Sequence, residues 1–173
     1  AGGEVTKTIA FRARSLLLTT KKREDISDSR EDFLEKQERN EKTAGCLLKQ
    51  YDIVLEEGYL KEFRMMEPGE EVPEAGGTIW YLYEVLAEES SWCNNQTYVD
   101  TLNQTATETF LARTHEKYAS VLQEAFGKSV PAIFTDEPHI WGVDLCGQKG
   151  QISLPYTEEL PWLYGQKSGL DFY

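Results

Sequence analysis

The sequence predicts an α+β fold, with an antiparallel, β-rich region over residues 1–90 and a helix–strand–helix segment over residues 91–173. Three observations lead to this prediction. Runs rich in aromatic and β-branched residues alternate with turn signals in the first half. Apolar residues recur at steps of three and four between Asn103 and Phe126, which is the period of a helix. The short apolar run from Val130 to Phe134 has the character of a strand buried on both faces.

Size and charge limit the class of protein and of partner. The chain has 173 residues, of which 40% are hydrophobic, so one packed domain of ordinary size is expected. The net charge of -12 disfavours nucleic acid and anionic membranes as partners, because both bind mainly through cationic side chains. Neutral ligands, cations and basic proteins remain open. No signal peptide opens the chain, and no apolar run is long enough to cross a bilayer.

The N-terminal elements follow from local patterns. Ile9 to Thr19 is β-like, although Leu16 to Leu18 is equally compatible with a helix. Ser27 to Lys42 is strongly charged and contains good helix formers, so it predicts an exposed helix or excursion, with Asp28 as the N-cap. The segments 46–55 and 59–66 flank Glu56-Glu57-Gly58 and predict a hairpin. Thr78 to Leu86 is the best strand of this half.

The C-terminal half predicts two helices around the apolar strand. The first runs from Asn103 to Phe126, with an apolar stripe that includes His115 and with Gly127 as its C-terminal stop. A histidine on such a stripe is more often a core residue than a catalyst. The second helix begins near Thr157-Glu158-Glu159, whose acids suit a helix N-terminus, and ends by Gly169.

The three cysteines indicate a reducing compartment. Cys46, Cys93 and Cys146 are odd in number, far apart and without a C-x-x-C spacing. A disulfide framework and a structural zinc site are therefore both disfavoured, and structural thiols in a cytoplasmic protein are expected. No P-loop, Rossmann pattern or other cofactor-binding signature is present, so no cofactor is predicted.

The strongest chemical signal is the acidic pair that ends the apolar run. Asp136 and Glu137 follow Phe134 closely, and Pro138 cannot continue a ladder of hydrogen bonds. Burial and a neighbouring carboxylate raise the pKa of such a group, as a proton donor near neutral pH requires. Asp136 would orient Glu137 or accept a hydrogen bond from a substrate hydroxyl. A helix cap or a loop salt bridge is the competing interpretation of the pair.

Aromatic and amide side chains near this pair suggest a sugar site. His139 and Trp141 follow it, and Trp92 and Asn95 precede the long helix. Flat rings beside acids and amides can hold sugar rings, although most aromatic residues are simply core. Asp136, Glu137 and His139 also offer metal donors, but ligands packed this closely along a strand seldom converge, so no metal site is predicted.

The second half resembles a group of bacterial glycoside hydrolases in the (β/α)8-barrel clan that includes the β-galactosidases. The resemblance covers Trp92 to Tyr173. Its matching pieces are Tyr98 to Leu102, Thr114 to Tyr118, Phe126 to Lys128, Ile133 to Pro138, Leu160 to Trp162 and Gly169 to Asp171. It implies that Asp136-Glu137-Pro138 is the motif after barrel strand four, usually Asn-Glu-Pro, and that Glu137 is the acid/base residue.

The resemblance further implies an incomplete barrel, because a whole one needs about 250 residues. Residues 1–90 would be an insertion between barrel elements, and the nucleophile would lie outside this chain, which would leave it inactive in isolation. Uncovered strand edges would favour a homodimer. A non-catalytic module that binds carbohydrate or protein is the alternative function.

Overall fold

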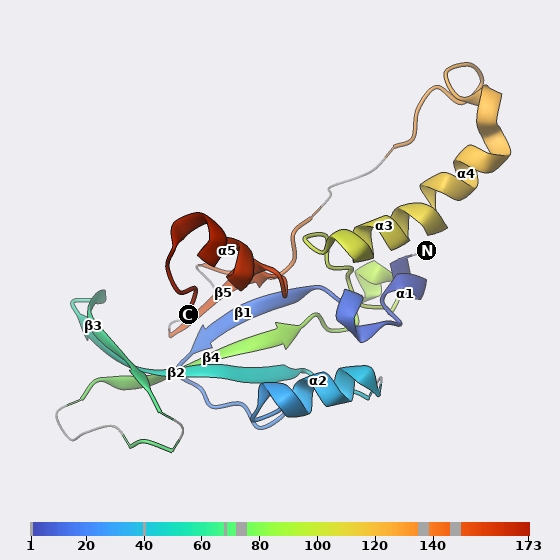
Figure 1. The fold of residues 1–173 in the computed structure, drawn as a ribbon. Coiled ribbons are helices and arrows are strands. Elements are labelled where there is room, and N and C mark those ends of the chain that lie inside the picture. Colours follow the sequence, from blue (N-terminus) through green and yellow to red (C-terminus); the bar gives the residue numbers. More distant parts are fainter. Residues whose placement is uncertain (1, 40, 68, 72–75, 135–138, 146–149) are drawn as a thin grey trace.

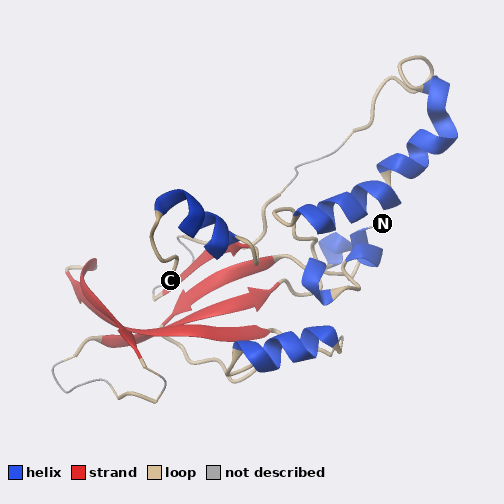
Figure 2. Ribbon diagram, in the orientation of Figure 1, coloured by secondary structure: helices blue, strands red, loops and turns tan. Residues whose placement is uncertain are grey.

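The computed structural model describes all residues except 1, 40, 68, 72–75, 135–138 and 146–149. It is a mixed α+β fold built on one curled, antiparallel sheet (Figures 1 and 2). This confirms the predicted fold class and the antiparallel character of the sheet. No helix among the described residues is long and apolar enough to span a membrane.

The sheet has five strands in the order β3-β2-β4-β1-β5. Their bounds are β1 Arg14–Thr19, β2 Gly45–Glu56, β3 Tyr59–Met66, β4 Thr78–Leu86 and β5 Gln151–Tyr156. All neighbouring strands pair antiparallel. Because β5 pairs with β1, the sheet joins strands from both sides of residue 90.

Short helices surround the sheet. The α-helices are α1 Gly2–Val5, α2 Arg30–Glu38, α3 Gln104–Arg113, α4 His115–Leu122 and α5 Leu160–Ser168. The 3-10 helices are η1 Ile9–Phe11, η2 Ser91–Cys93 and η3 Gln123–Ala125. Figure 1 shows α3 and α4 as an arm that extends away from the sheet.

Several local predictions are confirmed. The hairpin β2–β3 turns at Glu57 and Gly58, both at positive φ. The strand predicted over 78–86 is β4. Helix α2 forms inside the predicted segment, but its N-cap is Ser29, whose side chain accepts a hydrogen bond from the Asp32 amide, and not Asp28. Helix α5 ends at Gly169, as predicted.

The predicted strand from Val130 to Phe134 is wrong. Val130 makes one isolated bridge with Phe126, and residues 131–134 lie outside any strand. Phe134 is 85% exposed and Ile133 is 51% exposed. A short apolar run becomes a buried strand only if other strands flank it on both sides. No described strand lies beside this run.

The prediction of a single helix over 103–126 is also wrong, because the structure has two α-helices and a short 3-10 helix there. The chain forms α3, which Asn103 caps, and then breaks at Thr114, whose φ and ψ are -120° and -81°. The Thr114 hydroxyl donates to the carbonyl oxygen of Phe110 at 2.6 Å. The stripe that includes His115 faces solvent, because α4 has no buried residue. Helical period therefore predicted the secondary structure but not its burial.

Strand β5 was not predicted, although its sequence carries a signal. Ile152, Leu154 and Tyr156 alternate with Gln151, Ser153 and Pro155, which is the period of a strand. Proline is tolerated in an edge strand because its missing N–H can face away from the neighbour. The alternation in this segment therefore indicates a strand in spite of Pro155.

The register separates two faces of the sheet. Arg14 pairs with Leu86 and with Tyr156, and Cys46 pairs with Glu84, so these side chains share one face. Phe33 of α2 packs on this face with Ile9, Cys46 and Leu86. Ser15, Leu17, Val85 and Ser153 fall on the opposite face. The first face holds the apolar core, and the second is the face on which the candidate site lies.

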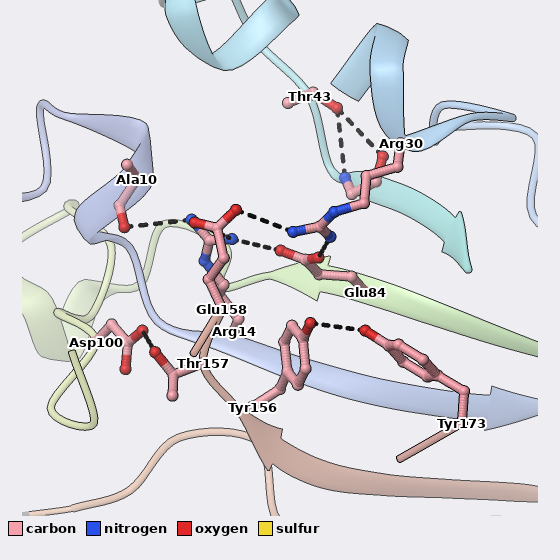
Figure 3. A network of polar contacts seen from close by, with 11 residues as sticks. Ala10, Arg14, Arg30, Thr43, Glu84, Asp100, Tyr156, Thr157, Glu158 and Tyr173 are labelled. Atoms are coloured by element: carbon pink, nitrogen blue, oxygen red, sulfur yellow. Dashed lines mark hydrogen bonds and ion pairs between the residues drawn. The ribbon is translucent and has the colours of Figure 1, made fainter. Parts of the chain in front are cut away.

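A buried ionic network crosses the core face (Figure 3). Glu84 of β4 is fully buried and lies between Arg14 of β1 and Arg30 of α2, with both N–O distances at 2.5 Å. Arg30 also binds Glu158, just before α5, at 2.9 Å. Arg14 donates to the Ala10 carbonyl oxygen at 3.2 Å. One carboxylate thus joins two strands and a helix that lie far apart in the chain.

Burial changes the acidity of the groups around this network. It raises the pKa of the Cys46 thiol to about 12, so the thiol stays protonated near neutral pH. It also raises the pKa of Tyr156, whose hydroxyl lies 3.0 Å from that of Tyr173 (Figure 3). These groups act as neutral hydrogen-bonding and packing partners.

Replacing Glu84 tests the network. The change Glu84→Gln removes the nearest counter-charge of the buried Arg14 guanidinium group and leaves Arg30 with Glu158 alone, which is expected to cost about 3–5 kcal/mol of unfolding free energy. Denaturant unfolding measures this loss. Glu158→Gln is the matched control, because Glu158 is 42% exposed and an exposed pair contributes about 0–1 kcal/mol. Equal losses in the two variants would contradict the central role of Glu84.

Asp100 predicts a dependence of stability on pH. It accepts hydrogen bonds from the Thr157 hydroxyl at 2.8 Å and the Leu102 amide at 3.0 Å, but burial dominates and raises its pKa above the ordinary 3.8. The folded state therefore binds this proton more tightly than the unfolded state does. The ionised Asp100 carboxylate therefore makes an unfavourable contribution to stability at neutral pH. This contribution improves as the pH falls through the raised pKa towards 3.8.

The variant Asp100→Asn removes this titration. Relative to the variant, the native chain is expected to gain unfolding free energy between pH 7 and pH 4. Thermal or denaturant unfolding of both proteins at these pH values measures the difference. A difference that does not change with pH would show that Asp100 titrates alike in the folded and unfolded chains.

Candidate functional site

The candidate site is built by the segment 139–145, which the side chain of Tyr98 holds in place. The Tyr98 hydroxyl accepts a hydrogen bond from the His139 amide at 3.2 Å, and the Thr101 hydroxyl donates to the His139 carbonyl oxygen at 3.3 Å. The rings of Tyr98 and Trp141 stack with centroids 6.1 Å apart and planes 24° apart. The His139 ring meets Tyr98 edge-on at 6.1 Å. These contacts fix the positions of two aromatic side chains.

The same segment is bound to strand β5. Asp144 and Ser153 exchange two backbone hydrogen bonds of 2.9 and 2.8 Å, and the Ser153 hydroxyl donates to the Gly142 carbonyl oxygen at 2.8 Å. Gly142 has a φ of +91°, and a Cβ atom built there would lie 2.5 Å from the Cβ of Ser15. Only glycine allows both this φ and this close approach to β1.

A pocket of about 390 Å³ lies between this segment and the sheet. A volume of this order is within the range of small-molecule sites. The sheet lines one side, and the segment with its aromatic ring lines the other. The lining residues are Ser15, Leu17, Val85, His139, Trp141, Gly142, Val143, Asp144, Gln151 and Ser153.

The chemistry of the lining favours a neutral, polyhydroxylated ligand. Trp141 offers a flat apolar surface, while Ser15 and Gln151 offer a hydroxyl and an amide. No lysine or arginine is among the described residues that line it. The net charge of the chain is -12. Among these described lining residues an anionic ligand would therefore find no cationic partner.

The predicted site residues separate into three groups. His139 and Trp141 lie together at the pocket. Trp92 and Asn95 lie elsewhere, on a turn: Trp92 is 96% exposed, and Asn95, at a φ of 56°, donates its amide hydrogen to the Ser90 carbonyl oxygen. Asp136 and Glu137 lie outside the described residues.

The structure adds pocket residues that sequence reasoning missed, namely Ser15, Asp144, Gln151 and Ser153. Gln151 and Ser153 occupy alternate positions of β5, and Ser15 is on β1. The alternation in β5 was the available signal. The pairing of β5 with β1, which brings these side chains together, has no counterpart in the local sequence.

Metal-ligating side chains do not gather in the part of the chain that the structure describes. No set of three His, Cys, Asp or Glu side chains there is placed to hold a metal ion. His115 is exposed, and its Nδ1 lies 2.9 Å from the Thr114 hydroxyl. Neither histidine therefore belongs to a described cluster of metal ligands.

Comparisons of the chain with protein-family models, curated proteins and solved structures find no match. The pocket and the Asp136-Glu137-Pro138 motif of the sequence are therefore the two features from which a function can be inferred.

The glycine at the pocket provides a direct test of its construction. Gly142→Ala is expected to displace the segment from β1, because its Cβ would overlap Ser15. Hydrogen exchange of the Asp144 and Ser153 amides should accelerate by about tenfold or more, the equivalent of about 1.4 kcal/mol. Gly127→Ala is the control, since Gly127 has a φ of +74° but no atom within 4 Å of its Cβ position. Unchanged exchange in Gly142→Ala would contradict the close packing.

Proposed function

We propose that this chain is part of a glycoside hydrolase in which the pocket beside Trp141 contacts the sugar and Glu137 is the general acid/base. The observation that carries the proposal is the pocket itself, which is lined by the aromatic side chain of Trp141 and by two paired strands that contribute a hydroxyl, from Ser15, and an amide, from Gln151. Stacking on the ring and hydrogen bonds to the polar groups are the two contacts that a sugar needs. Glu137 precedes His139, a lining residue, by two positions in the sequence.

In this proposal Glu137 donates a proton to the glycosidic oxygen as the bond to the leaving group breaks, and then accepts a proton from the attacking water. The proton is thereby returned to the carboxyl group and the cycle closes. Asp136 contacts a sugar hydroxyl. The second carboxyl group of the mechanism would come from a part of the protein beyond this chain. The fold proposed for the whole enzyme is a (β/α)8 barrel, of which this chain holds an incomplete portion.

Unpaired thiols support the proposed cytoplasmic location. Cys46 is buried and free, and Cys93 is also free. Thiols of this kind are usual in a reducing compartment.

The acid/base role predicts a selective kinetic defect. In the protein that carries this chain, Glu137→Gln should lower kcat by about 10²–10⁴ for glycosides with poor leaving groups. Activated aryl glycosides, which leave without protonation, should be affected much less. Steady-state rates on both substrate types measure the effect. Glu124→Gln is the control, because the Glu124 side chain is 92% exposed. Equal rates for Glu137→Gln and the native protein would remove Glu137 from the mechanism.

The pocket predicts sugar binding by the 173-residue chain itself. Methyl β-galactoside and methyl β-glucoside are suitable probes, with calorimetry or intrinsic tryptophan fluorescence as the readout. Gln151→Leu keeps the size of the side chain but removes its amide, and should weaken binding by about tenfold. Gln166→Leu on the exposed part of α5 is the matched control.

The same experiment separates the two candidate functions. Binding at the pocket without turnover, in both the chain and the protein that carries it, would favour the non-catalytic binding module. No binding of either sugar, or binding that Gln151→Leu does not weaken, would contradict the pocket as a sugar site.

A further inference from the structure

Strand β3 is the open edge of the sheet. It is the first strand in the order β3-β2-β4-β1-β5, and no described strand lies on its outer side. The other edge, β5, is partly covered, because Asp144 pairs with Ser153 through two backbone hydrogen bonds. Figure 1 shows β3 at the end of the molecule opposite the α3–α4 arm. Its unpaired N–H and C=O groups can accept another strand.

The side chains of β3 make this edge unusually apolar. The large hydrophobic side chains of this strand, Tyr59, Leu60, Phe63 and Met65, are all exposed, and Tyr59 has an exposed fraction of 79%. An exposed edge strand with such residues is a recognised site of strand addition. The charged residues Lys61, Glu62 and Arg64 lie between them and determine which strand can be added.

The hydrogen-bonding pattern limits how two copies of β3 can pair. Outward-facing backbone groups belong to every second residue, so a two-fold antiparallel pairing must be centred on a residue and not between two residues. Centring on Glu62 places the two copies of Glu62 opposite each other, and centring on Arg64 does the same for Arg64. Like charges directly opposite are destabilising. Centring on Phe63 places Glu62 opposite Arg64 on both sides of the axis.

The aromatic contacts favour the same register. Phe63 already meets Tyr51 of β2 edge-on, with ring centroids 6.4 Å apart and planes 64° apart. Pairing centred on Phe63 would bring the two Phe63 side chains together and extend this aromatic row across the axis. The irregularity in the β2–β3 register near Lys61 does not interrupt the central pairs of residues 62–64.

Arg64 can serve both chains. It binds Glu70 of its own chain at 2.5 Å, and its guanidinium group has further N–H donors for a second carboxylate. The partner that this edge fits best is therefore another copy of itself, because the opposite charges at positions 62 and 64 are complementary under two-fold symmetry.

We propose that the chain forms a two-fold dimer by antiparallel pairing of β3 with β3 of a second copy, in the register centred on Phe63. The sugar-binding proposal and this one are independent. The pocket lies at β1 and β5, on the other side of the sheet order, so the dimer would leave it open. A failure of either proposal does not affect the other.

Charge reversal tests the register directly. Sedimentation velocity of the native chain over a range of concentrations should show a monomer–dimer equilibrium. Glu62→Arg places arginines opposite arginines, and Arg64→Glu places glutamates opposite glutamates. Each variant alone should dimerise at least about tenfold more weakly. An equimolar mixture of the two should regain the dimer, because both pairs across the axis are then opposite in charge.

The controls separate this interface from general charge effects. Glu116→Arg on the exposed helix α4 changes the net charge as Glu62→Arg does and should leave dimerisation unchanged. Circular dichroism checks that each variant keeps the native fold. A native chain that stays monomeric at high concentration would overturn the proposal. A dimer that persists in both single variants would also overturn it. An equimolar mixture of the two variants that stays monomeric would contradict it as well.

Discussion

Glu84 is the residue on which the arrangement of the structure depends. Its carboxylate is fully buried and contacts Arg14 and Arg30, so one side chain of β4 connects the start of α2 to β4 and to the neighbouring strand β1. A carboxylate in this position is stable only when its counter-charges are present, because the desolvation of an unpaired ion is costly. The ionic network therefore links three elements that local sequence preferences alone would leave independent.

The two faces of the sheet have different roles, since one holds the core and the other forms the pocket. The ion pairs of Glu84, the buried thiol of Cys46 and the apolar core occupy the face that α2 covers. The opposite face of β1 and β5 presents short polar side chains to the segment 139–145 and leaves a pocket. Strand alternation produces this division, since neighbouring residues such as Arg14 and Ser15 point to opposite faces. The packed core face thus supports a more open face, where the proposed sugar would bind.

The proposed sugar site and the proposed dimer use opposite ends of the strand order. The pocket depends on β1 and β5, where Gly142 allows the chain to approach Ser15. The dimer depends on β3, where Glu62 and Arg64 can pair across a two-fold axis. Between them lie β2 and β4, which carry the core. Two surfaces of one small sheet can therefore serve binding and association without competing for the same residues.

Local sequence patterns by themselves determined the antiparallel hairpin, strand β4 and the helix that ends at Gly169. Each of these depends on turn chemistry, capping or periodicity within a few residues. Tertiary structure alone decided the burial of each element. The apolar run from Val130 to Phe134 lies outside any strand because no described strand flanks it, and the stripe of α4 faces solvent for want of a partner among the described residues. The tertiary structure also decided where the site lies. The pairing of β5 with β1 joins residues distant in the chain and brings Ser15 and Ser153 to Trp141.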